Sequence, residues 1–347
     1  MKPRHYSTGE HAAVRHGDCV EGLKALAPRT VDLIVTSPPY PGMGMSYGDR
    51  YSETDYVEFS RAWLTEAARV LTDTGSIWIN VGYMKRKDGT RVPLPYLLWP
   101  IIESLGLVLQ EEIVWAKPNR GTPASTRFTS RSERWLFVTK AAKGHTFNLD
   151  AVRLDPSENR SKDKRNNPKG ANPADVWEFG VVNGNAKDRP KHPCPFPVPM
   201  IERIVLACSN PGDLVCDPFS GSGSTGVAAL RHGRRYIGFE QLAEYVVDAA
   251  NRLLAEQARE IERLTAQISE LQQPRPRTLP ERGAPIETAI SKARSWNEAA
   301  RLASLSVNGK TIQRLRLEAA RKQLRTDHFT SKPGRVPSGH VGAGSLQ

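Results

Sequence analysis

Cysteine is scarce in this sequence, and its spacing argues against two kinds of stabilising site. The four cysteines are Cys19, Cys194, Cys208 and Cys216, and no two of them form a CxxC pair. Zinc sites usually draw on such close pairs, and disulfide frameworks belong to small, cysteine-dense secreted chains. We therefore expect neither a metal site nor a disulfide, and a reducing, cytoplasmic location.

Long apolar segments are also missing. The N-terminal stretch MKPRHYSTGEHAAVRHGD has no hydrophobic core of the kind found in a signal peptide. No apolar run approaches the roughly 18 residues that a membrane-spanning helix needs. We expect neither a signal peptide nor a membrane anchor.

Acidic side chains are the minority among the charged residues. The chain has 37 Asp and Glu against 49 Lys and Arg, which gives a net charge of +12. A charge excess of this sign favours a polyanionic partner such as nucleic acid over a cationic ligand.

The apolar pattern alternates between strand-like and helix-like segments along 347 residues. Such alternation is typical of an α/β fold, Rossmann-like, with a mostly parallel sheet covered by helices on both faces. Predicted strands are 31–35, 76–81, 113–115, 135–139, 214–216 and 235–239, and predicted helices are 56–71, 95–105, 199–207, 224–232 and 243–271.

The composition predicts a main domain over residues 1–272, followed by a Pro-rich linker at 273–285. Two short helical patterns, 286–302 and 310–324, then form a basic extension over 286–327, and residues 328–347 read as a disordered tail. The helix KTIQRLRLEAARKQLR is basic along much of its length. Three roles remain open for this helix: it contacts DNA, it pairs with a second copy of the chain, or its charges are simply solvated.

Two irregular, basic regions interrupt the main domain, around residues 118–132 and 155–192. Loops this long in a compact fold are usually functional or disordered, and cationic side chains there supply phosphate contacts. Taken singly, each of these cationic side chains is explained equally well as part of a solvated charged surface. The candidates for nucleic-acid contact are Arg127, Arg131, Lys164, Arg165, Lys169 and Arg189.

A glycine-rich turn follows the apolar run LVC and opens the helical segment VAALRHG. Gly221, Gly223 and Gly226 have the GxGxxG spacing that lets a backbone approach a ligand at a helix N-terminus. Tight strand-to-helix turns also use glycine for packing, so the glycines alone leave both readings open.

Two carboxylates sharpen the ligand reading. Glu240 ends the run RRYIGFE, where a carboxylate can accept both hydroxyls of a ribose. Asp217 precedes the glycines, where it suits a ligand with a positive charge and without a phosphate. S-adenosylmethionine is such a ligand.

The segment Thr36-Ser37-Pro38-Pro39-Tyr40 follows the predicted strand VDLIV, at the end where parallel sheets build their sites. Prolines stiffen the backbone and leave carbonyls free to accept hydrogen bonds from an amine. Tyr40 would stack on a base swung out of a duplex. A proline-stiffened turn with a packed tyrosine is the alternative.

Taken in order, these motifs resemble the permuted group of DNA amino-methyltransferases, over about residues 16–254. The matching segments are Gly17-Asp18, the SPPY segment, Asn172 to Trp177 (NPADVW, with Ala174 in place of the usual glycine), His192 to Pro197 (HPCPFP), Asp217 to Thr225 (DPFSGSGST) and Glu240.

The resemblance implies a seven-stranded sheet and direct, in-line methyl transfer from S-adenosylmethionine to an exocyclic amine of a flipped base. It makes residues 1–272 the catalytic domain, with Ser37, Pro38, Pro39 and Tyr40 as catalytic residues. Serine in SPPY, where adenine enzymes commonly carry Asp or Asn, favours cytosine N4, with adenine N6 as the alternative. The cofactor-binding residues that it implies are Asp18 (on the adenine), Phe196, Asp217, Phe219, Gly221, Ser222, Gly223, Ser224, Thr225 and Glu240.

The resemblance also implies a bacterial or phage-encoded enzyme acting on double-stranded DNA, as a monomer or homodimer, with a restriction endonuclease as a possible companion. A cysteine nucleophile at Cys194 is disfavoured, because that residue lies in a proline-rich loop rather than at a strand end. A non-enzymatic nucleic-acid binder on the same fold, or an enzyme acting on RNA, remains as an alternative.

Overall fold

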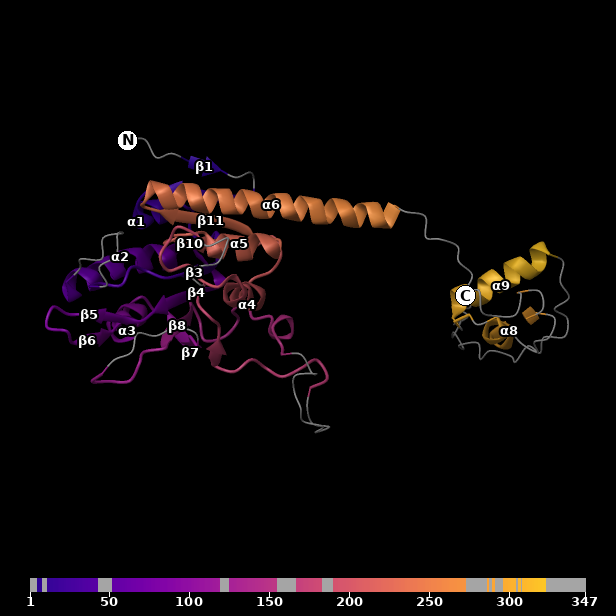
Figure 1. The fold of residues 1–347 in the computed structure, drawn as a ribbon, viewed down its shortest axis with the longest axis horizontal. Coiled ribbons are helices and arrows are strands. Elements are labelled where there is room, and N and C mark those ends of the chain that lie inside the picture. Colours follow the sequence, from indigo (N-terminus) through magenta and orange to yellow (C-terminus); the bar gives the residue numbers. More distant parts are fainter. Residues whose placement is uncertain are drawn as a thin grey trace, which may run out of the picture. The chain divides into compact units, whose positions relative to one another are not determined.

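The protein is described from a computed structural model (Figure 1). It describes residues 5–7, 11–42, 52–118, 125–154, 167–182, 190–272, 286, 289–290, 296–303, 305–306 and 308–322. The chain divides into two compact units, Met1–Ile268 and Ser269–Gln347. The assignment of residues 1–272 to a catalytic domain and of 286–327 to a basic extension stays a prediction. The predicted linker over 273–285 and the predicted tail over 328–347 lie outside the described residues.

The first unit is built on a sheet in the order β1-β2-β11-β10-β3-β4-β8-β7-β9. Strands β2, β11, β10, β3 and β4 run parallel, whereas β8 is antiparallel to both of its neighbours. The strands are β1 (His5–Ser7), β2 (Ala12–His16), β3 (Val31–Thr36), β4 (Leu71–Val81), β7 (Val108–Ala116), β8 (Ser132–Thr139), β9 (Val176–Glu178), β10 (Leu214–Asp217) and β11 (Arg235–Glu240).

Helices cover both faces of this sheet, as its strand sequences require. Along β3, Leu33 and Val35 belong to one hydrophobic cluster and Ile34, between them, to another, because successive strand residues point to opposite faces. The first cluster includes α4 (Val198–Cys208), α5 (Ser224–Arg231) and α6 (Ala243–Gln272). The second includes α1 (Cys19–Lys24), α2 (Glu53–Val70) and α3 (Leu94–Ser104).

These two layers confirm the predicted α/β class. All six predicted strands and all five predicted main-domain helices are present, with ends shifted by a few residues. The sheet has nine strands rather than seven because two edge strands of three residues each, β1 and β9, extend it. Sequence periodicity missed those two edge strands and the five-residue β2 beside β1, since strands this short carry too few apolar residues to show alternation. It also missed the small hairpin of β5 (Tyr83–Lys85) and β6 (Arg91–Pro93).

The second unit has a small core of its own. Ile290, Ala299, Ala300, Leu315 and Ala319 form a hydrophobic cluster, in which Ala299 and Ala300 belong to α8 (Trp296–Leu302) and Leu315 and Ala319 to α9 (Gly309–Arg321). Both helical patterns expected from the sequence are therefore represented. Across the described residues of both units, no helix is long and apolar enough to cross a membrane.

Candidate active site

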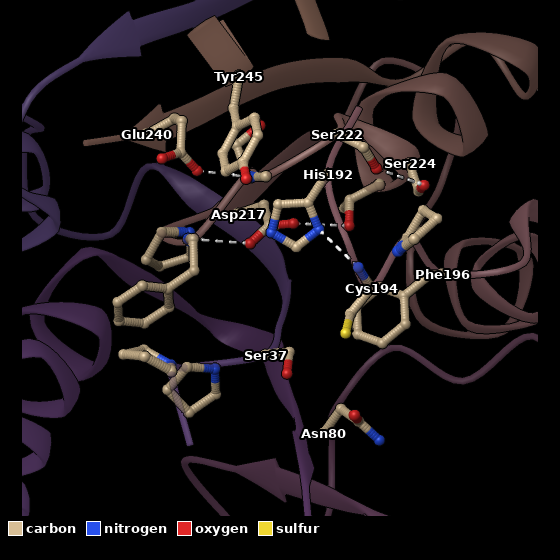
Figure 2. A pocket seen from close by; sticks show the side chains of 18 of the residues that line it. Ser37, Asn80, His192, Cys194, Phe196, Asp217, Ser222, Ser224, Glu240 and Tyr245 are labelled. Carbon is tan, nitrogen blue, oxygen red and sulfur yellow. Dashed lines mark hydrogen bonds between the residues drawn. The ribbon is translucent and has the colours of Figure 1, made fainter. Parts of the chain in front are cut away.

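A cavity of about 460 Å³ opens where β3, β4, β10 and β11 end. Figure 2 shows Glu240 at one end of it, Ser37 and Asn80 at the other, and Asp217 between them. Of the predicted catalytic and cofactor-binding residues, all except Gly223 line the cavity: Asp18, Ser37, Pro38, Pro39, Tyr40, Phe196, Asp217, Phe219, Gly221, Ser222, Ser224, Thr225 and Glu240. Their roles stay predictions, but their meeting in one cavity is a property of the fold.

Tyr40 is held by the neighbouring strand. Its hydroxyl donates to Asn80 Oδ1 at 2.8 Å, and Ser37 Oγ lies 3.5 Å from the same hydroxyl. Asn80, at the end of β4, is itself anchored because its Nδ2 donates to the carbonyl of Arg134 at 3.2 Å. Burial raises the pKa of Tyr40 well above its ordinary value, so the ring stays a neutral phenol at the cavity wall.

Asp217 joins the two halves of the site. Its carboxylate accepts hydrogen bonds from Thr36 Oγ1 at 2.6 Å, Thr225 Oγ1 at 2.8 Å and the Phe219 amide at 3.1 Å. The side chain is 3% exposed. Burial raises the pKa of Asp217 to about 6, although these three donors favour the charged form. The carboxylate is therefore a fixed, buried acceptor whose negative charge is poorly solvated.

The glycine turn serves both conformation and packing. Gly221 and Gly223 have φ of +49° and +73°, in the left-handed region that favours glycine. A Cβ at Gly226 would lie 2.6 Å from Leu253 Cδ2 and 2.7 Å from the Tyr236 ring. The third glycine of the spacing is thus required by helix packing, whereas the first two shape the backbone that lines the cavity.

Glu240 has both carboxylate oxygens oriented by the backbone. Oε2 accepts from the Gly221 amide at 2.9 Å and Oε1 from the Leu242 amide at 2.7 Å. Burial raises its pKa. Because β2 pairs with β11, the Gly17 amide donates to the Glu240 carbonyl at 2.9 Å, which brings Asp18 to the same rim. Asp18 there caps α1 by accepting from the amides of Val20 and Glu21.

Aromatic rings line the walls between these polar groups. The Phe219 ring lies 5.5 Å from Trp63 and 5.8 Å from Phe59, both on α2. Phe196, just before α4, packs 5.0 Å from the Trp135 ring. Beside them the hydroxyls of Ser222 and Ser224 lie 3.2 Å apart.

Several cavity residues were not identified from the sequence: Phe59, Asn80, Trp115, Lys117 and Glu133. They stand on or beside α2, β4, β7 and β8, and no short motif surrounds them. Only the strand order shows that β4, β8 and β7 follow β3.

His192 and Cys194 also line the cavity. His192 Nδ1 accepts from the Cys194 amide at 3.2 Å, and burial lowers the pKa of the imidazole to about 4. The imidazole is therefore neutral near pH 7. Cys194 lies in the loop before α4 and on no strand.

The predicted DNA-contacting residues that the structure describes do not line this cavity. Arg127, Arg131 and Lys169 are exposed, and Lys169 forms an ion pair with Asp150. Lys164, Arg165 and Arg189 lie outside the described residues, as does much of the region 155–192. In the described part of the chain, no group of three His, Cys, Asp or Glu side chains could hold a metal ion.

The chain matches the family model for DNA methylases named N6_N4_Mtase over residues 31–251. The type II methyltransferase M.ScaI of Streptomyces caespitosus is 36% identical over 264 residues, 73% of this chain and 84% of that protein.

Two solved structures share the fold. PvuII DNA methyltransferase, named as cytosine-N4-specific, has a TM-score of 0.60 at 22% identity and covers 72% of this chain and 89% of its own. TTHA0409 of Thermus thermophilus, solved in complex with S-adenosyl-L-methionine, has a TM-score of 0.52 at 27% identity, over 71% of this chain and 95% of its own. On the family match and on the extent of its likeness to M.ScaI, the chain belongs to the N6_N4_Mtase family of DNA methylases.

Proposed function

We propose that this DNA methylase transfers a methyl group from S-adenosylmethionine to N4 of cytosine in duplex DNA. The observation that carries the proposal is the Thr36–Asp217 hydrogen bond of 2.6 Å. It ties the SPPY segment to the glycine turn, so that a methyl donor and an acceptor base share one cavity.

The residues of the cavity fit the cofactor. Each oxygen of Glu240 accepts one backbone amide and has a lone pair left, so the carboxylate can accept the two hydroxyls of a ribose. The buried carboxylate of Asp217 favours a cationic end of the ligand. We assign the adenine end to Asp18 and the methionine end to Phe196 and the turn from Phe219 to Thr225. When bound, S-adenosylmethionine supplies an electrophilic methyl group on a positively charged sulfur.

The chain's own residues then act mainly by positioning. A flipped base stacks on Tyr40, whose ring is fixed by Asn80, and the Ser37 hydroxyl accepts a hydrogen bond from the base amine. Flipping costs a few kcal/mol, which stacking offsets. Orienting two bound reactants contributes about 7 to 11 kcal/mol. No general base is required, because the amine loses its proton to water after the transfer.

Ser37 supports the choice of cytosine, since adenine enzymes of this kind commonly carry Asp or Asn there. Adenine N6 is the alternative acceptor, with the same mechanism.

The name of M.ScaI supports a further proposal, that the chain acts in a type II system beside a cognate endonuclease in the bacterial cytoplasm. We also propose that Arg127, Arg131 and the basic loops around 118–132 and 155–192 contact the phosphates.

A non-enzymatic DNA binder is the competing class. One experiment separates cytosine methylation, adenine methylation and DNA binding without catalysis. The protein is incubated with unmethylated DNA and methyl-labelled cofactor, and the DNA is then digested to nucleosides and analysed by mass spectrometry. N4-methylcytosine supports the proposal, and N6-methyladenine keeps the mechanism but overturns the base. No labelled nucleoside, together with retained DNA binding, favours the binder.

A further inference from the structure

An ion pair between Lys117 and Glu133 lies in the wall of the cavity. Lys117 directly follows β7 and Glu133 lies on β8, where Glu133 pairs with Trp115. The Lys117 ammonium contacts Glu133 Oε1, and the two side chains are 15% and 21% exposed. Lys117 Nζ also lies 4.3 Å from the centroid of the Trp115 ring. All three residues line the same cavity as Ser37 and Tyr40.

The pair adjoins the SPPY end of the cavity. A Cβ built on Gly82 would meet Tyr40 Cε2 at 3.1 Å and Glu133 Cγ at 3.5 Å, so these side chains converge on one glycine. Burial is the main reason for the raised pKa of Tyr40, and the negative charge of Glu133 adds to it. The negative charge of Glu133 therefore acts on the residue expected to stack on the base.

A half-sequestered ion pair is a costly way to stabilise a fold, because taking two charges out of water offsets much of their attraction. Lys117 also retains binding capacity. Its ammonium has three N–H donors, and among the described residues its only hydrogen-bond acceptor is Glu133. Two donors therefore remain for a ligand in the cavity.

We propose that Lys117, oriented by Glu133, is a specificity-determining residue that donates hydrogen bonds to N3 and O2 of the target cytosine. The inference rests on the proposed function. Cytosine has two adjacent acceptors next to its amine, N3 and O2. Adenine has one, N1, followed by a C2–H that accepts nothing. A cation with two spare donors matches cytosine and leaves one donor unsatisfied against adenine. Glu133 is a positioning residue in this scheme.

Kinetics on the full-length protein test the assignment. We expect Lys117→Met to lower kcat/KM for cytosine methylation by about 10- to 100-fold, the usual range for losing hydrogen bonds to a charged group. Lys117→Arg should recover part of the loss, and Glu133→Gln should show a smaller one. Cofactor affinity should stay within about twofold in each variant. Lys143→Met removes the same charge from an exposed turn after β8 and should retain full rates.

A base analogue separates recognition from structure. Once the methylated position is mapped, 3-deaza-2′-deoxycytidine placed there keeps the amine but lacks the N3 acceptor. The analogue should slow the native protein more than it slows Lys117→Met. The inference is overturned if the analogue slows both proteins equally, or if Lys117→Met methylates cytosine as fast as Lys143→Met. In either case, N4-methylcytosine formed by the native protein still upholds the proposed function. Lys117→Met and Lys117→Arg losing cofactor affinity together would also overturn it. N6-methyladenine as the only native product overturns both proposals.

Discussion

Thr36 donates a hydrogen bond of 2.6 Å to Asp217, across 181 residues of sequence and between the adjacent strands β3 and β10. Each residue ends its strand and begins one of the two motifs. The contact is buried, so water does not compete for this hydrogen bond. This side-chain pair therefore adds to the β3–β10 strand pairing that already joins the glycine turn and the SPPY segment.

Removing the Asp217 carboxylate should weaken cofactor binding more than turnover. In Asp217→Ala three donors lose their acceptor, and unsatisfied buried groups cost about 1–3 kcal/mol each. We expect a lower melting temperature and a cofactor affinity reduced at least about tenfold, measured by thermal denaturation and titration calorimetry. Tyr40→Ala is the comparison, and an equal loss of cofactor affinity in both variants would contradict this division of roles.

Tyr40→Ala should reduce turnover on DNA while leaving the cofactor affinity near normal. Stacking of a base on an aromatic ring is worth about 1–3 kcal/mol, so we expect a loss of about 5- to 150-fold in kcat/KM. Tyr40→Phe keeps the ring and loses the hydroxyl's hydrogen bonds with Asn80 and Ser37. Its kcat/KM should lie between those of Tyr40→Ala and the native protein. A Phe variant as slow as the Ala variant would exclude stacking as the main contribution of Tyr40.

Cofactor affinity should fall as the pH drops from 7 to 5. The pKa of Asp217 is raised to about 6 by burial, so the carboxylate takes up a proton through this window and loses its attraction for a cation. Measured below pH 6, affinity should decrease by up to about tenfold per pH unit.

The control for this pH effect is Asp217→Asn. It should flatten the dependence without abolishing it, because burial also raises the pKa of Glu240. His192 contributes little in this window, since its pKa is about 4. An unchanged slope in Asp217→Asn would assign the proton to another group.

The same pKa shift predicts how Asp217 affects the stability of the cofactor-free protein. Because the folded pKa lies above the ordinary value of 3.8, the folded state binds more protons than the unfolded state between pH 4 and 6. The Asp217 contribution to the free energy of unfolding therefore decreases as the pH rises through this window. Denaturant titrations should show a smaller decrease in Asp217→Asn than in the native protein, and an equal decrease would show that Asp217 is not the group responsible.

Arg127→Ala should weaken DNA binding with little dependence on sequence. One lost phosphate contact reduces the slope of log K against log salt by about 0.9. Binding measured by fluorescence anisotropy over a range of salt concentrations gives that slope. Lys143→Ala is the charge-matched control, and an identical slope in both variants would remove Arg127 from the DNA-contacting set.

How far the sequence predicted the site can be judged from Tyr40 and Lys117. The strand VDLIV and the two prolines identified Tyr40 without any tertiary information, because their signal is local and lies within ten residues. Lys117 carried no such signal. It enters the cavity because β8 turns back antiparallel between β4 and β7, and pairings of strands far apart in sequence leave no periodic trace.

The sequence by itself determined the α/β class, the main helices and strands, and the positions of the SPPY segment, the glycine turn and Glu240. Each depends on periodicity or on the backbone preferences of glycine and proline, which act between neighbours in the chain. Only the tertiary structure decided that Asn80 holds Tyr40, that Gly226 serves packing, and that Lys117 and Glu133 join the cavity. These contacts depend on strand order and side-chain approach, which emerge when the sheet assembles and distant segments become neighbours.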